Sequence, residues 1–103
     1  MLNQVVLVGR LAGETEIIEA ETAKKIYKIL LAVPRSFKNE SGEYETDFIS
    51  CTLYGNIGEQ TNSWCEKGDL VGIKGRIKGQ DGKINIVAEK VTFLSSKKEG
   101  EKE

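Results

Sequence analysis

Aromatic side chains near the middle of the chain are the residues whose types and spacing point most directly to chemistry. Between Thr46 and Tyr54 the odd positions Ile49, Cys51 and Leu53 are apolar and predict a core face. The even positions place Phe48 and Tyr54 on the opposite face. Phe37 and Tyr44 flank the loop expected just before this segment. Rings that point away from a core can stack on unpaired nucleobases. Aromatic residues also favour strands and pair with neighbouring strands, so the pattern alone leaves both interpretations open.

A row of cations in a later segment fits the first interpretation. Lys74, Arg76 and Lys78 alternate with apolar residues between Leu70 and Lys78, so they share one face of a predicted strand. Three positive charges spaced two residues apart can follow a phosphate backbone. The same pattern is also typical of a soluble edge strand whose lysines discourage aggregation.

Catalytic and metal chemistry have little support in this sequence. The chain contains no histidine, which excludes Ser-His and Cys-His nucleophile pairs. Cys51, Cys65 and nearby carboxylates would be a poor set of zinc ligands. Carboxylates such as Asp47 and Asp69 are scattered, and no cofactor loop accompanies them. We therefore expect a non-catalytic protein without a metal or cofactor.

Length and charge indicate one soluble domain. The 103 residues include 15 Lys and Arg and 16 Asp and Glu, for a net charge of −1. Between Leu70 and Lys90, however, five bases outweigh two acids, and a polyanion needs only a local basic surface. The longest apolar run, from Ile29 to Val33, is far too short to span a membrane. No signal-peptide pattern follows Met1, so we expect a cytosolic protein.

Strand patterns dominate the chain and predict an all-β fold. A short helix is expected from Ile57 to Cys65, with Gly68 as its C-terminal cap. Pro34 is expected to end the second strand, and Asp81-Gly82 predicts a tight turn between antiparallel strands. The five predicted strands are Asn3–Leu11, Lys25–Val33, Thr46–Tyr54, Leu70–Lys78 and Ile84–Leu94.

Five strands with one short helix between the third and fourth is the element order of an OB-fold, a five-stranded Greek-key barrel. A small sandwich capped by a helix fits the element count nearly as well. The first two strands carry apolar residues on both faces, as Val6 and Val8 show on the first strand. The second face must be covered, either by another subunit or by the helix and loops.

Several short blocks of sequence are weak signals singly and specific when they occur in this order over residues 1 to 95. The blocks are Asn3–Leu11, Leu31–Phe37, Thr46–Gly55, Lys67–Val71 with Gly75–Ile77, and Ala88–Leu94. Together they resemble the bacterial single-stranded DNA-binding proteins. The resemblance implies an OB-fold domain over residues 1–95 that assembles as a homotetramer through dimers. It also implies that the assembly coats single-stranded DNA without marked base preference during replication, recombination or repair.

The resemblance also implies roles for particular residues. Base stacking is assigned to Phe37, Phe48 and Tyr54. The candidates for phosphate contact are Arg10, Arg35, Lys67, Lys74 and Arg76. Trp64 lies in the predicted helix and is expected to pack against the core. The alternative function is an OB-fold protein-interaction module, related to primosome or replication-restart proteins, whose outward rings meet a protein partner.

Two segments depart from the family pattern. The link Gly79–Lys83 is shorter than the family's hairpin and carries no ring, which predicts a smaller footprint and a lower affinity for DNA. Residues 96–103 form a short charged tail that is expected to be disordered. This tail lacks the family's acidic tip ending in Pro-Phe, which argues against recruitment of enzymes through it.

Overall fold

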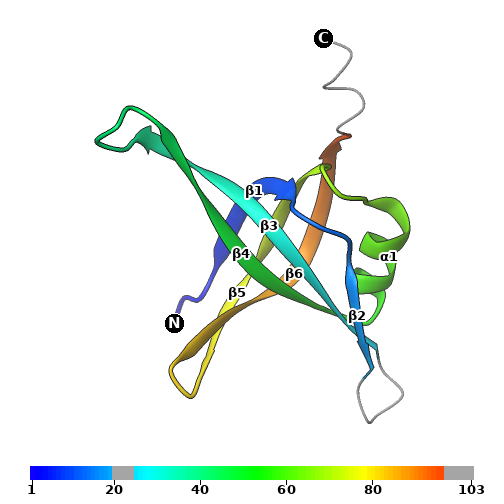
Figure 1. Ribbon diagram of the computed structural model, residues 1–103. Coiled ribbons are helices and arrows are strands. Elements are labelled where there is room, and N and C mark those ends of the chain that lie inside the picture. The colour runs from blue at the N-terminus through cyan, green and yellow to red at the C-terminus, as the bar shows by residue number, and fades with distance from the viewer. Residues whose placement is uncertain (20–24, 97–103) are drawn as a thin grey trace.

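Six strands and one helix make up residues 1–19 and 25–96, the part of the chain that this computed structural model describes (Figure 1). Of the expected tail over 96–103, residues 97–103 lie outside the described residues. The elements in chain order are β1 (Val5–Leu11), β2 (Glu16–Glu19), β3 (Lys25–Lys38), β4 (Tyr44–Tyr54), α1 (Asn56–Trp64), β5 (Leu70–Gln80) and β6 (Lys83–Ser95).

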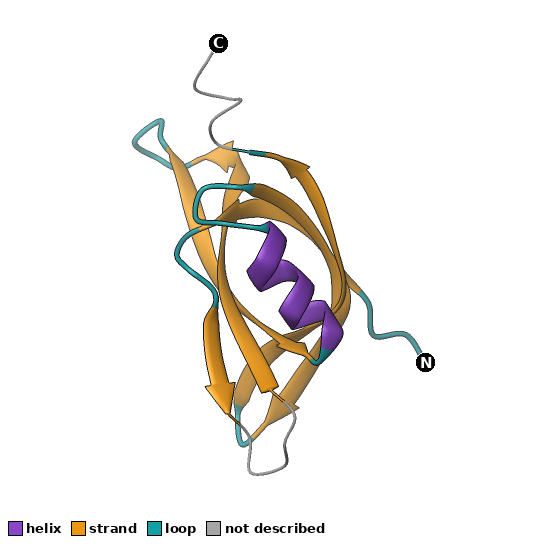
Figure 2. Cartoon of the chain, turned by 90° about the vertical axis from the view of Figure 1, so that its right-hand side faces the viewer, coloured by secondary structure: helices purple, strands orange, loops and turns teal. Residues whose placement is uncertain are grey.

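The strands close into a barrel. Their order in the sheet is β1-β5-β6-β4-β3-β2, and β1 also pairs with β3, so that β1, β5, β6, β4 and β3 form a closed ring. All pairings are antiparallel except a short parallel contact between β4 and β6. Helix α1 lies against this barrel between β4 and β5 in the sequence (Figure 2). The predicted all-β OB-fold with one short helix is confirmed, and the short edge strand β2 is an addition that was not predicted.

The barrel interior is filled by the alternate residues that the sequence assigned to the core. Its most deeply buried side chains are Leu31, Leu53, Ile73, Val71 and Cys51. Burial raises the pKa of the Cys51 thiol to about 11, so this cysteine is a small neutral core residue. Cys65 is only half-buried, as expected.

Helix α1 packs on the barrel through its smallest residues. Gly58 and Thr61 are its buried positions, and Gly58 lies directly against the ring of Tyr27. The helix ends at Trp64 with an extended Cys65 as its C-cap, so the prediction that Gly68 caps it is wrong. Gly68 instead has a φ of 95° in the turn that leads to β5, where a residue without a Cβ is favoured.

Two hairpins extend beyond the barrel and are longer than predicted. Strand β3 continues through Pro34 to Lys38, and β4 begins at Tyr44, so that both strands form an arm. Proline is tolerated there because the arm has only two strands, and the side without a neighbour needs no amide donor. The β5–β6 hairpin turns at Asp81 and Gly82, both with positive φ, which confirms the predicted tight turn.

Apolar side chains on the outer face of β1 are not covered within the chain. Val6 is 69% exposed and Val8 is 50% exposed, so neither the helix nor a described loop buries them. Among the described residues no helix has the length and apolar character that a membrane span requires.

Candidate nucleic-acid interface

The outer face of β4 carries two exposed rings. Phe48 is 63% exposed and Tyr54 is 45% exposed, while Ile49, Cys51 and Leu53 alternate with them on the core side. The prediction that these rings lie outside the core is confirmed. Phe37, 67% exposed on the arm, also points away from the core.

Tyr44 is a further exposed ring, at the first position of β4. It lies four residues before Phe48, so strand alternation places both rings on one face. The Nζ atom of Lys38 lies 5.7 Å from the centre of the Tyr44 ring, which is within the range of a cation–π contact. The sequence analysis noted Tyr44 but did not assign it to the site, because it expected a loop there rather than a strand.

Register pairs show which cations share a face with these rings. Residues that lie directly opposite each other on paired strands point to the same side of the sheet. Arg10 of β1 pairs with Ala32 of β3, and Ala32 pairs with Phe48, so Arg10 and Phe48 belong to one row on the outer face.

A second row crosses five strands of the same face. Arg76 of β5 pairs with Val87 of β6, and Val87 pairs with Thr52 of β4. Thr52 pairs with Lys28 of β3, and Lys28 pairs with Glu16 of β2. Thr52 lies between the two rings of β4, so this row brings two cations to the two sides of the aromatic strand. Lys28 was not assigned to the site from the sequence, although its even position on the second predicted strand placed it on this face.

The middle of the second row is the place where the two long hairpins meet. Here β4 and β6 pair through only Cys51 with Ile86 and Thr52 with Val87. Asn85 Nδ2 donates a hydrogen bond to Thr52 Oγ1 at 2.6 Å, and both Thr52 and Val87 are buried at under 5% exposure. We call these two pairs and the Asn85 bond the seam. The seam closes the sheet on the outer face between Arg76 and Lys28.

The remaining predicted cations are spread over the outer surface. Arg10 Nη1 donates to the Gly68 carbonyl at 3.0 Å, which places Arg10 beside the turn that contains Lys67. Lys74 of β5 pairs with Val6 on one side and Lys90 on the other. Arg10, Lys67 and Lys74 are exposed. Lys74 and Arg76 lie two residues apart on β5 with buried Gly75 between them, so they share its outer face.

Arg35 is held by carboxylates. Its Nε and Nη2 donate to Asp47, with Nη2 3.0 Å from Oδ1, and its Nη1 donates to Glu45 Oε2 at 2.6 Å. The hydrogen bond from Arg35 holds the pKa of Asp47 below its usual range, and the same bond raises the pKa of Arg35. The sequence offered no signal for this pairing. A loop was expected before Thr46, so no strand pairing was predicted that would bring Arg35 and Glu45 together.

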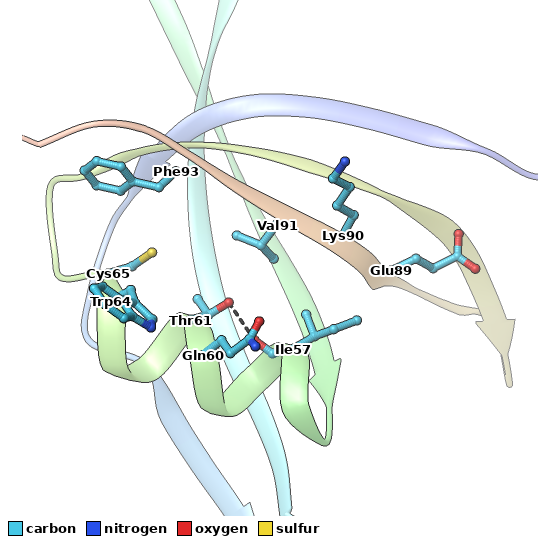
Figure 3. A pocket seen from close by; sticks show the side chains of 9 residues that line it. All are labelled: Ile57, Gln60, Thr61, Trp64, Cys65, Glu89, Lys90, Val91 and Phe93. Carbon is cyan, nitrogen blue, oxygen red and sulfur yellow. Dashed lines mark hydrogen bonds between the residues drawn. The ribbon is translucent and has the colours of Figure 1, made fainter.

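Trp64 lies outside the core, so the prediction that it packs there is wrong. Its side chain is 80% exposed at the end of α1, because the helix contacts the barrel through Gly58 and Thr61 and its last turn is open to solvent. Trp64 and Phe93 line a groove of about 410 Å³ between α1 and β6 (Figure 3). Across the described ranges 1–19 and 25–96, no cluster of three or more Cys, Asp or Glu side chains could hold a metal ion.

Comparison with known proteins identifies the family. A sequence profile of the single-strand binding protein family matches residues 2–94. The chain belongs to this family. Every candidate residue of the interface lies within the matched range, and so do β1 to β5 and nearly all of β6.

Individual relatives agree with this membership. The chain is 47% identical over 77 residues to single-stranded DNA-binding protein B of Bacillus subtilis, an alignment that covers 75% of this chain and 68% of the relative. It is 41% identical over 109 residues to single-stranded DNA-binding protein 3 of Listeria innocua, covering 97% of this chain and 68% of the relative.

A solved structure supports the fold. The chain superposes with a TM-score of 0.73 and 27% identity on a deletion mutant of the single-stranded DNA binding protein from Thermus aquaticus. The match covers 91% of this chain but only 51% of the Thermus chain, so this member of the family spans about half of that protein's length.

Proposed function

We propose that this protein binds single-stranded DNA without marked sequence preference, through base stacking and phosphate neutralisation. The observation that carries the proposal is the outer face of β4, which exposes Phe48 and Tyr54. Phe48 lies in one row with Arg10, and Thr52, between the two rings, lies in one row with Arg76 and Lys28. Membership of the single-strand binding protein family supports it.

The rings supply the affinity that does not depend on sequence. Every base has a π-face, so stacking on Phe37, Phe48 and Tyr54 accepts any base and contributes about 1–3 kcal/mol per stacked base. Bases within a duplex are already stacked on their neighbours and paired. An open face of exposed rings therefore favours unpaired strands.

The cations supply an electrostatic component. Each phosphate that a Lys or Arg neutralises releases counterions, so binding weakens as salt rises. We assign this role to Arg10, Lys67, Lys74 and Arg76, and Lys28 is placed to join them. Arg35 joins this set only when Glu45 and Asp47 release it.

The exposed apolar face of β1 favours a homo-oligomer. Val6 and Val8 remain open in the single chain, and a second copy of this surface would bury them. We propose a tetramer, a non-catalytic role in replication, recombination or repair, and a cytoplasmic location. The alternative, a protein-interaction module, would use the same exposed rings for a protein partner.

The deciding experiment is a titration of the purified protein into fluorescently labelled oligo-dT at two salt concentrations, with a duplex of equal length as control. We expect saturable binding to oligo-dT that weakens steeply with salt and is far weaker for the duplex. Equal binding to both nucleic acids would contradict the stacking role. An absence of any salt-sensitive binding to oligo-dT would favour the protein-interaction module.

A further inference from the structure

The arm formed by the ends of β3 and β4 has two chemically different faces. Strand alternation places Tyr44 and Phe48 on one face and Glu45 and Asp47 on the other. The first face carries Phe48, one of the rings proposed to stack on bases, whereas the register shift between Pro34 and Lys38 leaves Phe37 unassigned to either face. The opposite face carries the two carboxylates that hold Arg35.

The Arg35 guanidinium donates from all three of its nitrogens on this second face. Asp47 accepts bidentate hydrogen bonds from Nε and Nη2, and Glu45 accepts a hydrogen bond from Nη1. Three nitrogens of one side chain therefore donate to two carboxylates. The cluster of Arg35, Glu45 and Asp47 carries a net charge of −1.

Carboxylate and phosphate compete for the same part of an arginine. The planar fork of N–H donors accepts either anion in the same bidentate geometry. A phosphate that takes the fork of Nε and Nη2 would have to displace Asp47, and a phosphate at any part of Arg35 would meet the excess negative charge of the cluster. The cluster thus disfavours a DNA strand on this face. Phe48 lies on the other face of the arm, away from this negative charge.

We propose that Glu45 and Asp47 act as intramolecular competitors of DNA phosphate for Arg35, so that Arg35 adds little to DNA binding while both carboxylates hold it. This inference rests on the proposed function and concerns the affinity for the strand. Neutralising the two carboxylates releases Arg35 as an additional phosphate contact.

The test compares two double variants of the full chain that remove the same charge. Glu45→Gln with Asp47→Asn frees Arg35, whereas Glu40→Gln with Glu43→Gln removes two charges near the tip of the arm without touching the partners of Arg35. Binding of labelled oligo-dT is measured between 50 and 200 mM salt for both double variants and for the unaltered protein.

We expect the first variant to bind roughly threefold or more tightly at 50 mM salt, with a slope of log K against log salt that is steeper by about 0.7. Adding Arg35→Gln to it should remove both effects. Equal behaviour of the two double variants, or weaker binding by the first, would overturn the competition. If the first double variant melts at a much lower temperature, the single variants Glu45→Gln and Glu43→Gln are compared instead. Glu45→Gln retains the contact between Arg35 and Asp47.

The same titrations test the proposed function separately from the competition for Arg35. If the unaltered protein shows no salt-sensitive binding to oligo-dT, the function itself is wrong, whatever the variants do. If it binds and the two double variants do not differ, only the competition for Arg35 is wrong.

Discussion

Gly58 of the helix lies against the ring of Tyr27, with no room for a side chain between them. A Cβ atom at position 58 would lie 2.1 Å from Tyr27 Cδ1, and Tyr27 is itself buried in the core. The absence of a side chain at this position therefore sets how closely α1 approaches the barrel.

Gly58→Ala should destabilise the fold by about 1–3 kcal/mol, because the helix or the buried ring must shift. The measurement is urea-induced unfolding followed by circular dichroism. Gly72→Ala is the matched control, because its added Cβ meets its nearest neighbour at an ordinary 3.8 Å. Similar losses of stability in the two variants would contradict the close contact.

The rings of β4 should matter for binding and not for folding. Phe48→Ala and Tyr54→Ala are each expected to weaken oligo-dT binding by about 1–3 kcal/mol, with unchanged melting temperature, since both rings are exposed. The change is read from anisotropy titrations at fixed salt. Trp64→Ala provides the control, because it removes a more exposed ring from the end of α1. Unaltered binding in both β4 variants would remove the basis for stacking.

Arg76 should contribute one phosphate contact. Arg76→Gln is expected to reduce the slope of log K against log salt by about 0.7, the value for one contact to a single strand. Lys25→Gln makes the same change of charge at an exposed position that strand alternation assigns to the face opposite Lys28. Should both variants lower the slope equally, the effect would come from net charge rather than from the row that joins Arg76 to Thr52.

Asp47 should titrate at an unusually low pH. Its folded-state pKa is lowered mainly by the hydrogen bond from Arg35, so the pair stabilises the folded state at neutral pH. This contribution is lost as the pH falls through the lowered pKa, and it is small because both side chains are exposed. Carbon-13 NMR of the Asp47 carboxyl should report the low midpoint, and Arg35→Gln should move it upward. An identical midpoint in the two proteins would show that the ion pair does not form in solution.

The outer face of β1 should control assembly. Val8→Glu places a charge in the exposed apolar surface and is expected to yield a smaller species by light scattering coupled to size-exclusion chromatography. Ile84→Glu, at a more exposed apolar position on the β5–β6 hairpin, should leave the assembly unchanged. A monomeric unaltered protein would contradict the proposed oligomer directly.

Much of this fold could be predicted because burial follows strand alternation. The odd positions of β4 and the turn at Asp81 and Gly82 were identified from local patterns, and local geometry determines both. Strand β2 was missed because four residues with a glutamate at each end carry no alternating signal. Its strand conformation comes from pairing with β3, where Glu16 lies opposite Lys28.

The site was predictable in its rings and less so in its charges. The exposure of Phe48 follows from strand alternation alone. The partners of Arg35 depend on the arm, and the sequence did not predict that β3 continues beyond Pro34 to form it. Trp64 was misplaced because a large apolar ring in a short helix usually packs inward. Here the small residue Gly58 takes the contact with the barrel instead.

The seam has a consequence for how the molecule folds. The β3–β4 and β5–β6 hairpins each join neighbours in the sequence and can form early, whereas the Asn85–Thr52 bond joins residues 33 positions apart. Closing the ring must therefore await contacts only two residue pairs long, at the seam and between β1 and β3. These short contacts hold the fewest strand pairs of the ring, so transient opening of the native protein should begin at them, and at the seam it would release one side of the strand that carries the rings.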